Sequence, residues 1–134
     1  MKEAVLMEFD EALGTEESFW HDYHLEVSSE LLAQFAEQDW QSLEKQMLTR
    51  PQYWQERCAE AIGYMDNEEG IPALTALLDS PHLSVAAIAA SELDNMGIAL
   101  PARLRARLMQ IQAYAETHES TRRDDIENLI ARLA

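Results

Sequence analysis

YWQERCAEAIGYMD (residues 53–66) and SVAAIAASELDNMG (residues 84–97) are the two stretches of sequence that decide the fold, because they carry the same pattern. At a constant offset of 31 positions, apolar or small residues coincide in four pairs: Trp54 with Val85, Cys58 with Ala89, Ile62 with Leu93, and Met65 with Met96. In each stretch these positions follow the spacing i, i+4, i+8 and i+11, which lies on one face of an α-helix and does not match the alternation of a β-strand. The two stretches are therefore predicted to form equivalent helices.

A third helical segment, IPALTALLD (residues 71–79), lies between the two equivalent helices. A unit that recurs after a few tens of residues is typical of stacked helix pairs, in which each unit buries its apolar face against the next. Pro51, Pro72 and Pro81 each stand near a predicted helix start, where the missing N–H costs little. The sequence thus predicts an all-α protein built by helix stacking.

The run CAEAIGYMDNEEGIPALTALLDSPHLSVAAIAASELDNMG (residues 58–97) resembles the short HEAT-like repeat, roughly 30 residues long, of phycobilisome-lyase-type repeat proteins. The resemblance is carried by three segments: AEAIG (residues 59–63), IPALTALL (residues 71–78) and DSPHLSV (residues 79–85). This chain differs from the family pattern at Ala86, where an arginine is usual, and at Glu92 and Asp94, where small residues are usual.

This resemblance and the repeat offset together imply a right-handed HEAT-like α-solenoid of about three helix pairs. We expect one domain, residues 1–134, in which residues 1–27 are an N-terminal helical extension and residues 28–134 carry the repeats. The pattern also predicts six further helices: residues 3–13, residues 16–24 with Thr15 as N-cap, a helix that starts at Ser28 or Ser29, a helix from Trp40 that ends before Pro51, residues 101–114, and a last helix with Ile126, Leu129, Ile130 and Leu133 on its inner face.

The chain has 134 residues, of which 47% are hydrophobic, so it is the size of one domain and can bury a true core. This composition excludes a disordered acidic tail. No apolar run approaches the roughly 20 residues that a membrane span needs, and residues 1–12 carry acids where a signal peptide is apolar. We therefore expect a soluble cytoplasmic protein. The single Cys58 lies on an apolar stripe and is expected to be a buried core thiol.

Charge is the strongest clue to function. The net charge is −15, and it is uneven: residues 1–69 hold 17 acids and four bases, whereas residues 70–134 hold eight acids and six bases. The electrostatic field of this net negative charge repels nucleic-acid phosphates and anionic lipids, so neither nucleic acid nor a membrane is expected as a partner. It suits a basic protein partner, and the alternative is an acidic surface that only maintains solubility.

The predicted helix over residues 16–24 places aromatic side chains among acids, a combination common at protein interfaces. Its alternative role is to cap the open end of the helix stack. Residues Glu37, Asp39 and Glu44 are expected to be exposed, and residues 66–70 form an acidic turn. The candidate partner-binding residues are therefore Glu16, Glu17, Trp20, Asp22, Tyr23, Glu26, Glu37, Asp39, Asp66, Glu68 and Glu69.

Signals of catalysis or of metal binding are weak. His21 and His24 have the i, i+3 spacing of two ligands on one helix face, with Glu26 close behind, but no further ligand set accompanies them, and surface histidines are the expectation. The sequence has no phosphate-binding glycine loop, nucleophile elbow or metalloprotease motif, so we predict neither an enzyme nor a cofactor. Arg103, Arg105 and Arg107 are expected to pair with neighbouring acids.

Two hypotheses of function remain open at this point. A small, very acidic helical protein without catalytic motifs resembles the immunity proteins that bacteria make against their own toxins, many of which are basic nucleases. This hypothesis makes the chain an acidic module that neutralises a basic partner. The alternative, from the repeat resemblance, is a HEAT-like scaffold, chaperone or lyase-type subunit.

Overall fold

The computed structural model describes the backbone of residues 2–134 and the side chains of residues 4–134. The α-helices are α1 (Lys2–Leu13), α2 (Asp22–Leu32), α3 (Glu37–Gln46), α4 (Gln52–Met65), α5 (Ile71–Leu77), α6 (Leu83–Asn95), α7 (Arg105–His118) and α8 (Ser120–Ala131). Short 3-10 turns are η1 (Met47–Thr49), η2 (Glu68–Gly70) and η3 (Ala102–Leu104). Every regular element in the described residues is a helix, which confirms the all-α prediction.

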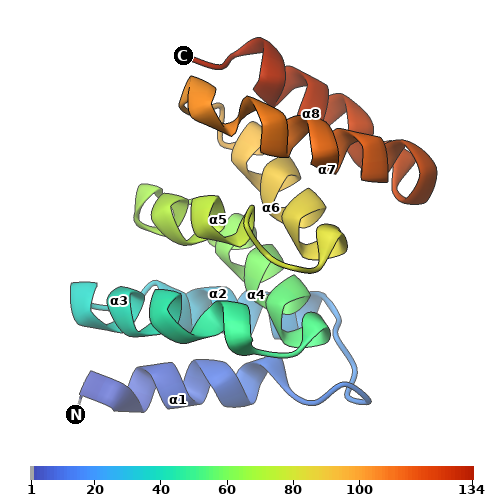
Figure 1. Cartoon of the computed structure of the whole chain (residues 1–134). Coiled ribbons are helices and arrows are strands. Elements are labelled where there is room, and N and C mark those ends of the chain that lie inside the picture. The colour runs from blue at the N-terminus through green and yellow to red at the C-terminus, as the bar shows by residue number, and fades with distance from the viewer. Residues whose placement is uncertain (1) are drawn as a thin grey trace.

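The even-numbered helices form a continuous row, because α2 packs against α4, α4 against α6, and α6 against α8. On the other side, α1 contacts α3 and α3 contacts α5, while α7 packs against both α6 and α8. Figure 1 shows that the helices follow one another from α1 and α3 at one end to α7 and α8 at the other, so that the two termini lie far apart. A surface along this stack therefore joins segments that are distant in sequence.

The predicted equivalent helices are α4 and α6, which pack directly against each other. Six of the eight matched positions are buried with at most 1% of their surface exposed, and Met65 and Met96 are half-buried. Around α6 the burial is complete over residues 85–90, because this helix is surrounded by α4, α5, α7 and α8. Cys58 lies inside this core, as expected, and burial raises the pKa of its thiol, so the group stays protonated at neutral pH.

Residues 14–21 are a loop, so the predicted helix over residues 16–24 is wrong; α2 begins only at Asp22. The cause is Arg57, a buried side chain of α4. Its guanidinium donates hydrogen bonds to the carbonyl oxygens of Leu13 (2.7 Å), Thr15 (2.8 Å) and Ser18 (3.0 Å). These bonds satisfy the carbonyl group at the end of α1 and two carbonyl groups of the loop, and they hold the loop against α4, which local helix signals cannot reveal.

Ser28 and Ser29 do not start a helix, because α2 runs through both to Leu32. Both serines are buried in this helix, which packs against α4. The Ser29 hydroxyl donates to the Glu26 carbonyl oxygen at 2.8 Å, so a bond within the helix itself satisfies this buried polar group. The division between residues 1–27 and 28–134 stays a prediction, and it falls inside this helix.

The loops between helices are joined by buried polar contacts. The Ser80 hydroxyl donates to Gln55 Oε1 at 2.7 Å, and the Gln55 amide donates to the Arg50 carbonyl oxygen at 2.7 Å. Arg107 donates to the Leu78 and Ser80 carbonyl oxygens, each at 2.6 Å. The expectation that Arg107 pairs with acids is therefore wrong: its charge is used to bind the exposed carbonyl end of α5 and the loop after it.

Candidate functional site

The predicted partner residues of the N-terminal region lie on the loop before α2 and on the first turns of α2. Side chains of Glu16, Glu17, Asp22, Tyr23 and Glu26 are all exposed. Phe19 and Tyr23 expose 75% and 71% of their surface, which is unusual for aromatic side chains of this size.

Each of the two exposed rings contacts the ring of a histidine. Phe19 stacks on His21 with ring centroids 5.4 Å apart, and Tyr23 meets His24 edge-on at 5.5 Å. The His21 backbone N–H donates to His24 Nδ1 at 3.2 Å, so His24 is used to cap the first turn of α2. Among the described residues, no group of three or more His, Cys, Asp or Glu side chains is placed to hold a metal ion.

Trp20 differs from its neighbours because it is half-buried. Its indole N–H donates to Glu60 Oε2 at 3.1 Å, and the Arg57 guanidinium lies 5.5 Å from its ring centroid. The loop therefore contributes one half-buried ring, Trp20, and one exposed ring, Phe19, and α2 contributes the exposed Tyr23.

The expectation that Asp39 is an exposed acid is wrong, and its role in partner binding stays a prediction. It exposes only 5% of its surface, and its carboxylate accepts a hydrogen bond from the Ala36 N–H at 2.8 Å. This bond satisfies a free backbone donor at the start of α3, where a negative charge also interacts favourably with the helix dipole. Glu37 of the same helix is exposed.

The structure brings Glu37 together with the acidic turn in a pocket of about 410 Å³, which we call the acidic pocket. Its lining residues are Glu37, Trp40, Gln41 and Glu44 of α3, Glu69 of η2, and Pro72 of α5. Trp40 is 6% exposed, and its indole nitrogen has no acceptor among the described residues. Asp66 and Glu68 are exposed on the same turn but do not line the pocket. The pocket thus combines three carboxylates with an apolar surface.

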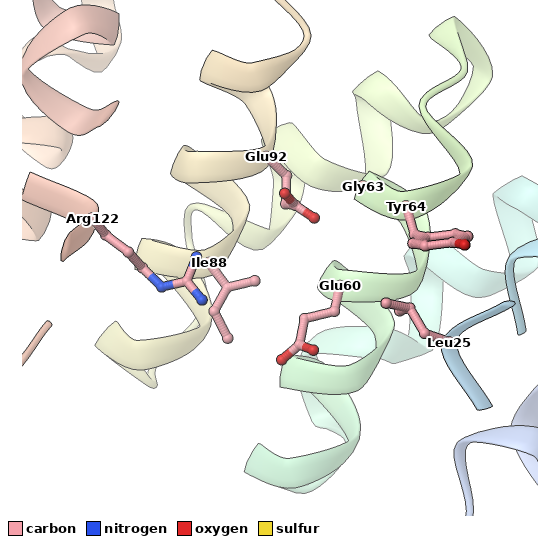
Figure 2. A pocket seen from close by; sticks show the side chains of 7 residues that line it. All are labelled: Leu25, Glu60, Gly63, Tyr64, Ile88, Glu92 and Arg122. Atoms are coloured by element: carbon pink, nitrogen blue, oxygen red, sulfur yellow. The ribbon is translucent and has the colours of Figure 1, made fainter. Parts of the chain in front are cut away.

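A second hollow, of about 360 Å³, lies on the row of even-numbered helices, and we call it the row groove. It is lined by Leu25 of α2, by Glu60, Gly63 and Tyr64 of α4, by Ile88 and Glu92 of α6, and by Arg122 of α8. Figure 2 shows the Glu60, Glu92 and Arg122 side chains reaching into one shared space, with Leu25 and Ile88 beside them.

The row groove has two carboxylates, Glu60 and Glu92, but only one guanidinium, Arg122. Arg122 Nε donates to Glu119 Oε1 at 3.1 Å, so its charge is already paired. Burial raises the pKa of the Glu92 carboxyl; the Asn95 amide and Arg122 oppose this effect, whereas Glu60 and Asp125 add to it. The lining of the groove thus has two carboxylates, one of them partly buried, and one guanidinium that is already paired.

Sequence reasoning missed the row groove as a site, because its lining comes from four helices. One signal was present: Glu92 stands where the resembling repeats usually have a small residue. The space for this side chain comes from Gly63, because a Cβ atom at position 63 would overlap the Glu92 carboxylate.

Comparison of the chain with protein-family models, with curated proteins and with solved structures gave no significant match. No helix within residues 2–134 is both long and apolar enough to cross a lipid bilayer.

Proposed function

We propose that this protein binds and neutralises a basic protein partner, as an immunity protein that inhibits a cognate bacterial toxin such as a nuclease. The observation that carries the proposal is the acidic pocket, in which Glu37, Glu44 and Glu69 surround the apolar surfaces of Trp40 and Pro72.

The three carboxylates of the acidic pocket are available to a partner. Among the side chains of residues 4–134, the ion pairs involve other acids: Asp10, Asp94, Glu119, Asp124 and Glu127. A lysine or arginine of a partner can place its aliphatic stem along the apolar surface and its charge among the carboxylates. Such complementarity accelerates association and disfavours acidic competitors.

A separate exposed region, formed by the loop before α2 and the first turns of α2, has a different chemistry. Exposed Phe19 and Tyr23 provide aromatic area beside the carboxylates of Asp22 and Glu26. Exposed aromatic rings that become buried on binding commonly supply much of the binding energy. In this proposal the acids mainly steer the encounter, and the aromatic rings mainly slow dissociation.

For the framework we propose a right-handed HEAT-like α-solenoid of about three helix pairs after an N-terminal extension. The equivalence of α4 and α6 and the succession of contacts along α2, α4, α6 and α8 support it. A repeat stack of this kind provides a rigid, extended surface for a macromolecular partner. We propose no catalytic role for it, and we expect the isolated protein to show no nuclease, hydrolase or bilin-transfer turnover.

The test takes as candidate partner a basic toxin domain, sought among the products of the neighbouring genes, and measures its association by stopped-flow fluorescence at low and high salt. The triple variant Glu37→Gln/Glu44→Gln/Glu69→Gln should associate about tenfold more slowly at low salt, because each neutralised contact weakens steering. A matched control, Glu8→Gln/Glu30→Gln/Asp79→Asn, removes the same charge at exposed positions outside both hollows and should retain most of the rate. Equal rates for the two triple variants would contradict the assignment of the pocket.

The second candidate function is a HEAT-like scaffold, chaperone or lyase-type subunit, and the repeat resemblance over residues 58–97 favours it. It predicts an association partner with a related repeat fold or a pigment pathway enzyme encoded nearby. If the original protein fails to bind and inhibit the neighbouring toxin domain, this candidate takes precedence.

A further inference from the structure

The row groove is separate from the acidic pocket in every lining residue and in the helices that build it. The acidic pocket lies on α3, η2 and the start of α5, whereas the groove spans α2, α4, α6 and α8. We propose that the row groove is a second binding site, which takes an arginine side chain from an extended basic segment of a protein.

The row groove contains more acidic groups than basic groups. Glu60 and Glu92 lie on neighbouring helices, and the negative charge of Glu60 helps to raise the pKa of Glu92. The cation of the groove, Arg122, is bound to Glu119, and Asp125 adds a further negative charge nearby. A bound cation removes this repulsion, and the partly buried position of Glu92 strengthens the attraction relative to an exposed acid.

The lining of the row groove matches a long side chain that ends in a charge. Leu25 and Ile88 give the groove apolar walls, and Tyr64, which is 52% exposed, presents an aromatic ring at its side. A long aliphatic stem that ends in a charge matches apolar walls with carboxylates between them. An acidic or purely apolar side chain matches only one half of this lining.

The placement of the two carboxylates favours arginine over lysine as the ligand. The carboxylates of Glu60 and Glu92 come from different helices, so a single ligand has to reach both. A guanidinium is planar, has five N–H donors in fixed directions, and stacks on aromatic rings such as Tyr64. An ammonium group is a more strongly hydrated point charge, which loses more on entering a partly desolvated groove.

A hydrogen bond from Trp20 orients the Glu60 carboxylate in the groove. The Trp20 indole N–H holds Glu60 Oε2 at 3.1 Å, which leaves the other carboxylate oxygen, Oε1, free for a ligand. Gly63 completes the arrangement, because only a residue without a side chain leaves the space that the Glu92 carboxylate occupies.

The test titrates the full chain with a capped Gly-Arg-Gly-Arg-Gly peptide at low ionic strength and follows the backbone amides by NMR. We expect saturable shifts at Gly63, Tyr64, Ile88 and Glu92. The same peptide with lysine should bind severalfold more weakly, and the peptide with citrulline, a neutral isostere of arginine, should not shift these signals. Shifts confined to the acidic pocket, or equal binding of the citrulline peptide, would overturn the proposal.

The variant Glu60→Gln/Glu92→Gln keeps the shape of both side chains and should weaken arginine-peptide binding about tenfold, through loss of two charge-assisted contacts. Glu8→Gln/Glu30→Gln is the matched control, with the same change in net charge at exposed positions away from the groove. Unchanged affinity in the groove variant also refutes the proposal. If that variant does not fold, the amide shifts of the original protein decide the question alone. None of these results alters the toxin test, because that test changes only the acidic pocket.

Discussion

The indole N–H of Trp20 donates a hydrogen bond to the carboxylate of Glu60, 3.1 Å away, and this bond joins the N-terminal loop to the row groove. The two residues are 40 positions apart in sequence. Trp20, selected from the sequence as a partner anchor, is half-buried and contributes to packing. The exposed aromatic rings of this region are those of Phe19 and Tyr23, and we expect these rings to contact a partner.

This bond makes a prediction for Trp20→Phe, which removes the indole N–H and keeps an aromatic ring. The free energy of unfolding should fall by about 1 kcal/mol, the net contribution of one hydrogen bond to a charged group that stays partly solvated. Urea denaturation followed by circular dichroism measures this value. Phe19→Ala is the control, and because this side chain is exposed its effect should stay within about 0.5 kcal/mol.

Arg57 makes a stronger prediction, because it binds three carbonyl oxygens of residues 13–18 from a buried position. Arg57→Met leaves those acceptors without their donor and should lower the free energy of unfolding by about 2–4 kcal/mol. Hydrogen exchange should show lost protection concentrated in the loop of residues 14–21. An equally large effect of Arg105→Met, at an exposed position, would contradict this explanation.

The Glu92 carboxyl makes stability depend on pH. Burial raises its pKa in the folded protein above the reference value of 4.5, so the folded state binds this proton more tightly than the unfolded state does. Its ionisation therefore costs stability above the raised pKa, and this cost disappears as the pH falls below about 4.5. Glu92→Gln should consequently be more stable than the original protein at pH 7.

Thermal unfolding of both proteins between pH 7 and pH 4 measures this dependence. The stability advantage of Glu92→Gln should shrink steadily as the pH falls. A constant advantage at every pH would show that ionisation of Glu92 is not its cause. Glu8→Gln, on an exposed residue, is the control for the general effect of removing one negative charge.

Gly63 and Glu92 should be coupled. Gly63 lies inside α4, where alanine is normally favoured over glycine by about 0.5–1 kcal/mol. A methyl group at this position displaces the Glu92 carboxylate, so Gly63→Ala should stabilise the Glu92→Ala protein more than it stabilises the original. A double-mutant cycle on unfolding free energies measures the difference, and an interaction energy of zero would contradict the close approach.

The sequence predicted the helices whose signals are local. The stripe of Trp54, Cys58 and Ile62 identified the buried face of α4, and the matching stripe identified α6. The prediction from sequence failed where a distant side chain determines the backbone conformation. Thr15 followed by two acids is typical of a helix start, but Arg57 binds the carbonyl groups that a helix would use. Asp39 was misjudged because its exposure depended on capping geometry, and not on its charge.

The sequence by itself determined that this chain is helical, that its core follows a 31-residue offset, and that its negative charge lies mainly in residues 1–69. These properties are set by residue type and by periodicity along one helix. Only the tertiary structure decided that Glu37 meets Glu69 in one pocket and that Glu60, Glu92 and Arg122 line another. Their meeting depends on how separate helices pack side by side. The spacing of residues within a single helix identifies its buried face, but it does not specify which side chains of other helices lie opposite.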